Sequence, residues 1–176
     1  MKASELSFGV EMECYIPLEY REFFPVGHYH RGYQIRVAPA GWNTQHDGSV
    51  ICYDHRYIGA EVVSPILRGE DGLCQIWYMA DLLQQVGAKV DSHCGLHVHV
   101  DARHLTRAQV RQVMRAFTKY EKAFFGLSGA MGNDRWNSRY CKPSHRWLNP
   151  TDDRYQSLNV TNFERYETKK TIEFRV

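Results

Sequence analysis

The segment SHCGLHVHVDAR, Ser92–Arg103, decides how the chain folds because apolar and polar residues alternate along it. Successive side chains of an extended strand point to opposite faces of the sheet. Such a strand directs Leu96, Val98 and Val100 toward a core. The polar residues then share the other face: Gly95, His97, His99 and Asp101. The sequence therefore predicts a sheet face that carries a row of imidazoles.

Alternation of the same kind predicts further strands, and charged residues recur on one face of each. LSFGVEMECYI, residues 6–16, places Glu11 and Glu13 on one face. YIGAEVVSPIL carries Glu61 and ends at a proline, and TIEFRV carries Glu173 and Arg175 on one face. YQIRVAP and QSLNV predict two more strands, and the Asp-Gly pair at residues 47–48 predicts a hairpin-like reversal.

Two segments change to a helical period. Residues 73–86 predict a helix that stops at Gly87, and Thr106 with Gln109 predicts a capping box at the start of a second helix. Residues 126–155 are long, polar and aromatic, which predicts a functional loop. The order of strands, helix, strand, helix and strands favours one α+β domain over residues 1–176, with a mainly antiparallel sheet. The first helix repeats its apolar residues at Leu73, Ile76, Trp77, Ala80, Leu83 and Val86, and the second at Val110, Val113, Met114, Phe117 and Phe124.

Composition excludes several partners. A net charge of +2 is too small to indicate binding to nucleic acid or to a membrane surface. The five cysteines include no C-x-x-C pair, which favours reduced thiols in a cytoplasmic protein. No apolar run approaches transmembrane length, and Glu11 and Glu13 interrupt any signal core at the N-terminus.

The repeated strand carboxylates require compensation. Two carboxylates about 4 Å apart repel by roughly 4 kcal/mol at an effective dielectric constant of about 20. One arginine and two neutral histidines cannot balance four such groups, whereas divalent cations can. Each residue alone is more readily explained as a solvated sheet face or a hydrogen-bonded histidine, but together they favour a metal site. An oxygen-rich set with one imidazole suits Mg²⁺ or Mn²⁺, and the phosphates of a nucleotide would complete the coordination. The candidate ligands are Glu11, Glu13, Glu61 and Glu173, together with one imidazole from His97 or His99.

FGVEMEC, HDGSV, GAEVVSPILRG, CGLHVHVDA, NSRYCKP and TIEFRV, in this order, resemble the amidoligase family. That family is related to glutamine synthetase and glutamate–cysteine ligase. The resemblance implies a curved, mainly antiparallel sheet like that of the glutamine synthetase catalytic domain, with helices on its convex face. It also implies that the concave face holds Mg²⁺ and ATP.

The resemblance implies a role for each matching residue. Glu11, Glu13, Glu61, His97 and Glu173 match the metal ligands, with Glu13 and Glu173 also serving catalysis. His99 would approach the phosphates of ATP, and Arg175 would stabilise charge on the transferring phosphoryl group. Asp47 matches a position that could contact the substrate amine. Arg135 and Arg139 lie in the loop where such enzymes bind phosphate or carboxylate groups, and either could act.

The implied reaction is ATP-dependent amide formation through an acyl phosphate, between a small-molecule or peptide carboxylate and an amine. Two alternatives stay open: a metal-dependent hydrolase that uses the same carboxylates, and a non-catalytic ligase-like domain that binds a partner. The chain ends two residues after I-E-F, where family members usually continue, so a C-terminal truncation would leave the pocket open. A homo-oligomer is compatible with this length, because glutamine synthetase relatives place active sites between subunits.

Overall fold

The computed structural model describes residues 5–128, 138–144 and 154–176, and within them it contains eight strands and three α-helices. The strand pairings in each part of the chain are antiparallel, so the predicted α+β class is confirmed. The chain divides into two compact units, residues 1–96 and 97–176, and each is described by itself. That residues 1–176 act as a single domain stays a prediction.

The first unit contains a sheet centred on two long strands, β1 (Ser7–Pro17) and β4 (Tyr57–Val63), which pair antiparallel. The short strand β3 (Asn43–Gln45) pairs with the other edge of β4, and β2 (Tyr33–Gln34) pairs with β3. The start of β1 also pairs with β5 (Leu67–Arg68). A 3-10 turn, η2, follows β1 at residues 18–20. The predicted strands are therefore present, although YQIRVAP contributes only two strand residues.

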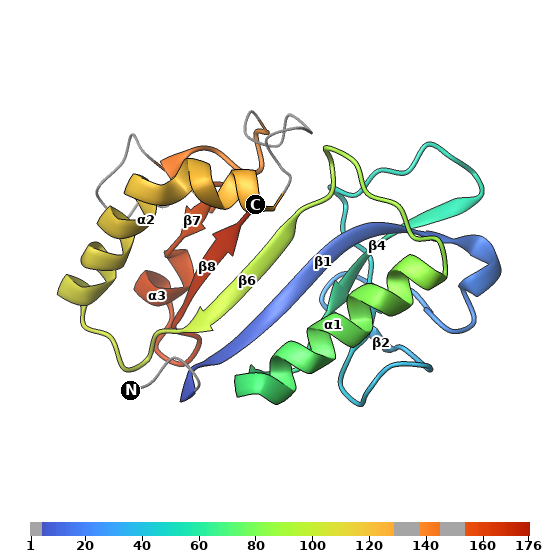
Figure 1. Ribbon diagram of the computed structural model, residues 1–176, viewed down its shortest axis with the longest axis horizontal. Helices are drawn as coiled ribbons and strands as arrows, with labels where there is room; N and C mark the ends of the chain where they lie inside the picture. The colour runs from blue at the N-terminus through green and yellow to red at the C-terminus, as the bar shows by residue number, and fades with distance from the viewer. Residues whose placement is uncertain (1–4, 129–137, 145–153) are drawn as a thin grey trace. The chain divides into compact units, whose positions relative to one another are not determined.

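Helix α1 (Gly69–Gln85) lies beside β1 and β4 in Figure 1, and Gly87 follows it at a φ of 74°. Glycine adopts this left-handed backbone conformation without steric strain, which explains why the helix ends here as predicted. The predicted buried stripe is partly wrong, because Leu73 is 53% exposed and Trp77 is 78% exposed. Leu83 of the predicted stripe is buried, and Gly72 and Met79, which were not predicted, complete the buried side of α1.

Gly72 explains why the buried side of α1 differs from the predicted one. A Cβ built on Gly72 would lie only 2.9 Å from the Leu67 Cβ of β5 and 3.1 Å from the Phe8 ring of β1, so a larger residue here would clash with both strands. Phe8 belongs to the face of β1 that also carries Val10, Met12 and Cys14, and α1 therefore covers this apolar face. The opposite face of β1, with Glu11 and Glu13, is turned away from the helix.

The second unit contains β6 (Leu96–Asp101), β8 (Thr171–Arg175) and β7 (Leu158–Asn159), with β8 paired antiparallel to both neighbours. The helices α2 (Arg107–Leu127) and α3 (Thr161–Arg165) flank these strands in Figure 1. Among the described helices and strands of this unit, only α3 was not predicted, because a helix of five residues gives no periodic signal.

The capping box at the start of α2 is confirmed. Thr106 accepts a hydrogen bond from the Gln109 backbone N–H, and the Gln109 side chain accepts one from the Thr106 N–H. The apolar face of α2 packs on β8, with the Phe117 and Phe174 rings 5.4 Å apart. Phe124 is 44% exposed, so the predicted stripe is buried over its first three turns only. The core of this unit consists of Ala102, Val110, Met114, Phe117, Leu158, Val160, Phe163 and Ile172.

In both units, then, a helix covers one face of the strands, and the predicted strand carboxylates and histidines lie on the other. Along the described segments of the chain, none of the helices has the length and apolar character that crossing a membrane requires.

Candidate metal and phosphate site

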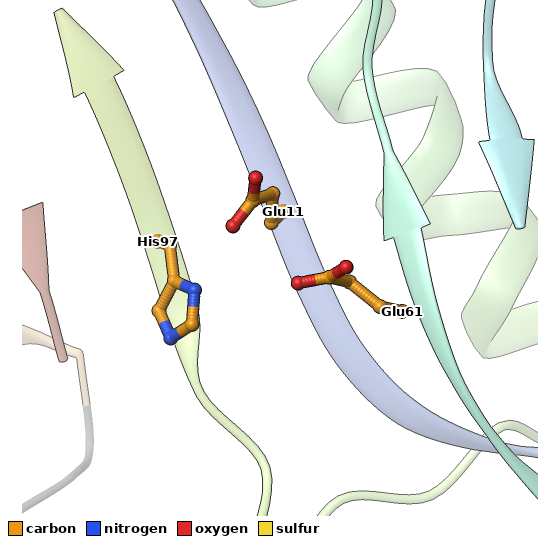
Figure 2. A group of neighbouring side chains, drawn as sticks. All are labelled: Glu11, Glu61 and His97. Carbon is orange, nitrogen blue, oxygen red and sulfur yellow. The ribbon is translucent and has the colours of Figure 1, made fainter. Parts of the chain in front are cut away.

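Four carboxylates form the acidic cluster of the first unit: Glu11, Glu13, Asp47 and Glu61. The register of β1 and β4 sets Glu13 directly opposite Glu61, so their side chains share one face of the sheet. Glu11 lies two residues before Glu13 on that face. Figure 2 shows the Glu11 and Glu61 side chains on the same side of their two strands. The predicted convergence of these acids is therefore present within this unit.

The carboxylates of the acidic cluster are held by specific donors. Glu13 and Glu61 are each only 5% exposed. The Glu13 Oε2 accepts a 2.6 Å hydrogen bond from the Gly95 N–H, and the Glu61 Oε2 accepts a 2.5 Å bond from the Gln45 amide. Asp47 accepts a 2.6 Å hydrogen bond from the Ser49 N–H and a further one from the Ser49 hydroxyl. These bonds fix three carboxylates before any ligand is added.

Mutual repulsion and burial act on Glu61. Burial, followed by the negative charge of Glu11, raises the pKa of Glu61 to about 8, although the Gln45 hydrogen bond acts in the opposite direction. The negative charges of Asp47 and Glu13 contribute to the same rise in pKa. The acidic cluster therefore retains a proton at neutral pH that a cation could displace.

The donor set fits a hard divalent cation. Glu13, Asp47 and Glu61 each offer one carboxylate oxygen, and the three oxygens lie within 4.8 Å of one another. Oxygen-only coordination suits Mg²⁺ or Mn²⁺, and few protein ligands leave positions for water or phosphate. Asp47, predicted as a substrate contact, thus belongs to the same group of carboxylates as Glu13 and Glu61.

The second unit brings together His97, His99, Glu173 and Arg175, here called the histidine–arginine cluster. In the register of β6 and β8, His97 pairs with Arg175 and His99 pairs with Glu173. The alternation predicted for the SHCGLHVHVDAR segment is confirmed by this register, because Val98 pairs with Phe174 on the opposite face. The burial differs from expectation: His97 is 3% exposed and Leu96 is 38% exposed.

Glu173 is the centre of the histidine–arginine cluster. Its Oε1 accepts a 2.6 Å hydrogen bond from the Arg175 Nε and lies 3.7 Å from the His97 Nδ1 and 4.0 Å from the His99 Nε2. Its Oε2 accepts a 2.7 Å hydrogen bond from the Asn159 amide. The carboxylate is therefore oriented on both oxygens and still has lone pairs for a further ligand.

Arg175 is buried, and backbone carbonyls hold its guanidinium. The Nη1 atom donates to the Tyr140 carbonyl at 3.0 Å and to the Arg154 carbonyl at 3.4 Å. Arg139 is exposed and places its guanidinium over the Tyr140 ring, 4.7 Å from the centroid. Arg135, the other predicted loop arginine, lies outside the described residues.

Three residues that position these clusters were not predicted: Gln45, Gly95 and Asn159. Asn159 gave the only usable signal, since a polar amide in a short strand between apolar neighbours suggests a buried partner. Gln45 contacts Glu61 through strand pairing across a long connection, and Gly95 acts through its backbone N–H. Neither contact produces a pattern that can be recognised in the local sequence.

Cys14 and Cys94, which both interact with Glu13, are weak nucleophiles at neutral pH. Burial raises the pKa of Cys14 to about 12 and that of Cys94 to about 11, so both are thiols at neutral pH. All five cysteines are free in the structure.

An α+β fold whose antiparallel strands carry buried, facing carboxylates is compatible with the binding of a divalent cation. A family model described as "Putative amidoligase enzyme" matches residues 4–149, and the chain belongs to this family. No curated protein and no solved structure matches the chain.

The matched region includes the acidic cluster, both histidines and the loop arginines. Glu173 and Arg175 lie beyond it. The resemblance of the last strand to the family therefore depends on the TIEFRV motif, which the register places beside His97 and His99.

Proposed function

We propose that the chain is an ATP- and Mg²⁺-dependent carboxylate–amine ligase that forms an amide bond through an acyl phosphate. The observation that carries the proposal is the acidic cluster, in which Glu13 and Glu61 face each other while buried. Membership of the amidoligase family supplies the reaction class. Mn²⁺ is an alternative to Mg²⁺, because both prefer oxygen ligands.

The acidic cluster would hold the cation through Glu11, Glu13 and Glu61, and in the second unit His97 and Glu173 are the proposed ligands. When bound, the ion would neutralise charge on the phosphates of ATP. The hydrogen bonds from Gly95 and Gln45 support these roles, because donors beside a ligand carboxylate orient it. Asp47 is proposed to hold the ammonium group of the substrate amine, which its negative charge favours.

Arg175 is the proposed group that stabilises charge on the transferring phosphoryl group. Its hydrogen bonds to Glu173 and to two backbone carbonyls fix its guanidinium, which favours a preorganised electrostatic role. His99, which is less buried than His97, is proposed to contact the phosphates. Arg139 is exposed and is the proposed loop contact for a phosphate or carboxylate, with Arg135 as the second candidate.

The proposed reaction has two steps. The γ-phosphoryl group of ATP passes to an oxygen of the substrate carboxylate, which breaks its bond to ADP. The amine nitrogen then attacks the acyl carbon, the bond to phosphate breaks, and the nitrogen loses a proton as the amide forms. The carboxylate and the amine each belong to a small molecule or to a peptide. The reaction requires no nucleophile from the protein.

The decisive experiment measures ADP release with Mg²⁺ against mixtures of carboxylic acids and amines. We expect release only when ATP, acid and amine are all present, and an acid labelled with ¹⁸O should transfer label to inorganic phosphate. Glu13→Gln should abolish this turnover, while Glu22→Gln, the same change at an exposed position, should leave it intact.

Other outcomes contradict the proposal in different ways. Metal-dependent hydrolysis without ATP would identify a hydrolase that uses the same carboxylates. Partner binding that survives Glu13→Gln, without any turnover, would identify a non-catalytic domain.

A further inference from the structure

Glu121 is a buried carboxylate that the proposed reaction does not use. It lies in α2 at the position where the stripe of Val110, Met114 and Phe117 continues, and only 1% of it is exposed. An apolar residue would satisfy this position by packing alone. A carboxylate here is costly unless hydrogen bonds compensate it. Its presence in the stripe therefore requires a structural reason.

The hydrogen bonds of Glu121 join two segments that are distant from it in sequence. Its Oε1 accepts from the Ser144 N–H at 2.5 Å and from the Ser157 hydroxyl. The two serine hydroxyls lie 2.8 Å apart, and the Ser144 Oγ also accepts from the Leu158 N–H at 3.0 Å. A single carboxylate thus fixes segment 138–144 against segment 154–158.

These two segments are the ones that hold Arg175. The Arg175 guanidinium donates to the carbonyls of Tyr140, in the first segment, and Arg154, in the second. The Arg175 backbone N–H donates to the Ser157 carbonyl at 2.7 Å, and Ser157 is the residue whose hydroxyl bonds Glu121. The segments also pair directly, through Lys142 N–H to the Tyr155 carbonyl at 2.7 Å.

We propose that Glu121 is a positioning residue for Arg175: by joining Ser144 and Ser157 it sets the spacing of the carbonyls that orient the guanidinium toward Glu173. Glu121 does not contact a reacting group in this account. Its consequence for catalysis rests on the proposed function, in which Arg175 faces the transferring phosphoryl group. The orientation of Arg175 itself can be measured without that reaction.

The test uses the full chain labelled with ¹⁵N and follows the Arg175 Nε–H resonance, whose proton is bonded to Glu173. Glu121→Gln keeps the volume but removes the charge, and Ser157→Ala removes one donor while keeping the Ser157 carbonyl. In both variants we expect the Nε–H proton to exchange with water at least about tenfold faster, because its orientation is less fixed. Glu167→Gln, the same change at an exposed position, should leave the exchange rate unchanged.

The kinetic test follows ADP release with the same variants. We expect kcat to fall by about tenfold to a hundredfold, because small displacements of a catalytic group reduce the rate strongly. The KM for ATP should stay within about twofold, since ground-state binding is not the function assigned to Arg175. A merely structural role would lower the amount of folded protein without separating kcat from KM.

The outcomes separate the two proposals. Unchanged Nε–H exchange in both variants overturns the positioning role, and so does faster exchange with an unchanged kcat. Faster exchange in the variants, together with a wild-type chain that shows no ATP turnover, supports the positioning of Arg175 and contradicts the ligase reaction. If Glu121→Gln does not fold, Ser157→Ala carries the test.

Discussion

Replacing Glu61 by glutamine should stabilise the metal-free protein and weaken its response to metal. The unfolded chain has an ordinary Glu61 carboxyl with a pKa near 4.5, whereas the folded protein raises this pKa to about 8. Between these values the folded state binds the proton more tightly than the unfolded state. The contribution of Glu61 to stability is therefore full below pH 4.5 and is lost as the pH rises toward 8.

The magnitude follows from the size of this shift. A pH of 7 is roughly 2.5 units above the pKa of the unfolded carboxyl, and each unit corresponds to about 1.4 kcal/mol. Protonating or desolvating Glu61 in the folded protein therefore lowers the free energy of unfolding by about 3 kcal/mol. The amide of Glu61→Gln is neutral at every pH, and its oxygen can still accept the Gln45 hydrogen bond. We therefore expect the variant to unfold with a free energy up to about 3 kcal/mol higher at pH 7.

The assay is urea unfolding at pH 5 and pH 8, in EDTA and with excess Mn²⁺. In EDTA, the wild type should lose stability between these pH values while Glu61→Gln loses less. Excess cation should narrow the difference between the two proteins, because ligand at a hundred times its Kd adds about 2.7 kcal/mol to the wild type. Glu22→Gln serves as the exposed control. An equal pH slope for wild type and Glu61→Gln would refute the reasoning from buried repulsion.

Further predictions concern the same clusters and the core. Metal affinity should rise with pH up to about 8, by at most tenfold per unit, since the cation displaces the Glu61 proton; calorimetry in buffers of different ionisation enthalpy should detect the released proton. Asn159→Leu should weaken metal binding by about tenfold to a hundredfold, because Glu173 loses a donor on Oε2, and unchanged Mn²⁺ affinity would contradict this. Phe117→Ala should lower the free energy of unfolding by about 3–5 kcal/mol through loss of core packing; thermal unfolding checks it, and a change below about 1 kcal/mol would exclude Phe117 from the core.

The sequence predicted those parts of the fold that local periodicity controls. Alternation located β1, β4, β6 and β8, and the Thr106–Gln109 pair located the start of α2. The buried side of α1 was predicted only in part: Leu83 is buried, but hydrophobicity favoured Trp77, whereas close packing selected Gly72. A glycine that allows backbones to approach has no hydrophobic signal.

The candidate site was predicted within each unit for a similar reason. Because side chains alternate along a strand, Glu11 shares a sheet face with Glu13, and Glu173 shares one with Arg175. The strand register then places Glu61 opposite Glu13, and His97 and His99 opposite Arg175 and Glu173. Gln45, Gly95 and Glu121 act through contacts between distant segments, which one sequence cannot show. That the acids of both units bind the same metal ions stays a prediction.

Titration with Mn²⁺, followed by electron paramagnetic resonance, tests most directly whether the buried acids hold a divalent cation. The wild-type chain should remove the free Mn²⁺ signal at a defined stoichiometry, and added ATP should alter the spectrum of the bound ion. Glu13→Gln should bind at least about tenfold more weakly, because it removes one ligand charge beside Asp47 and Glu61. Equal binding by wild type and Glu13→Gln would contradict the account.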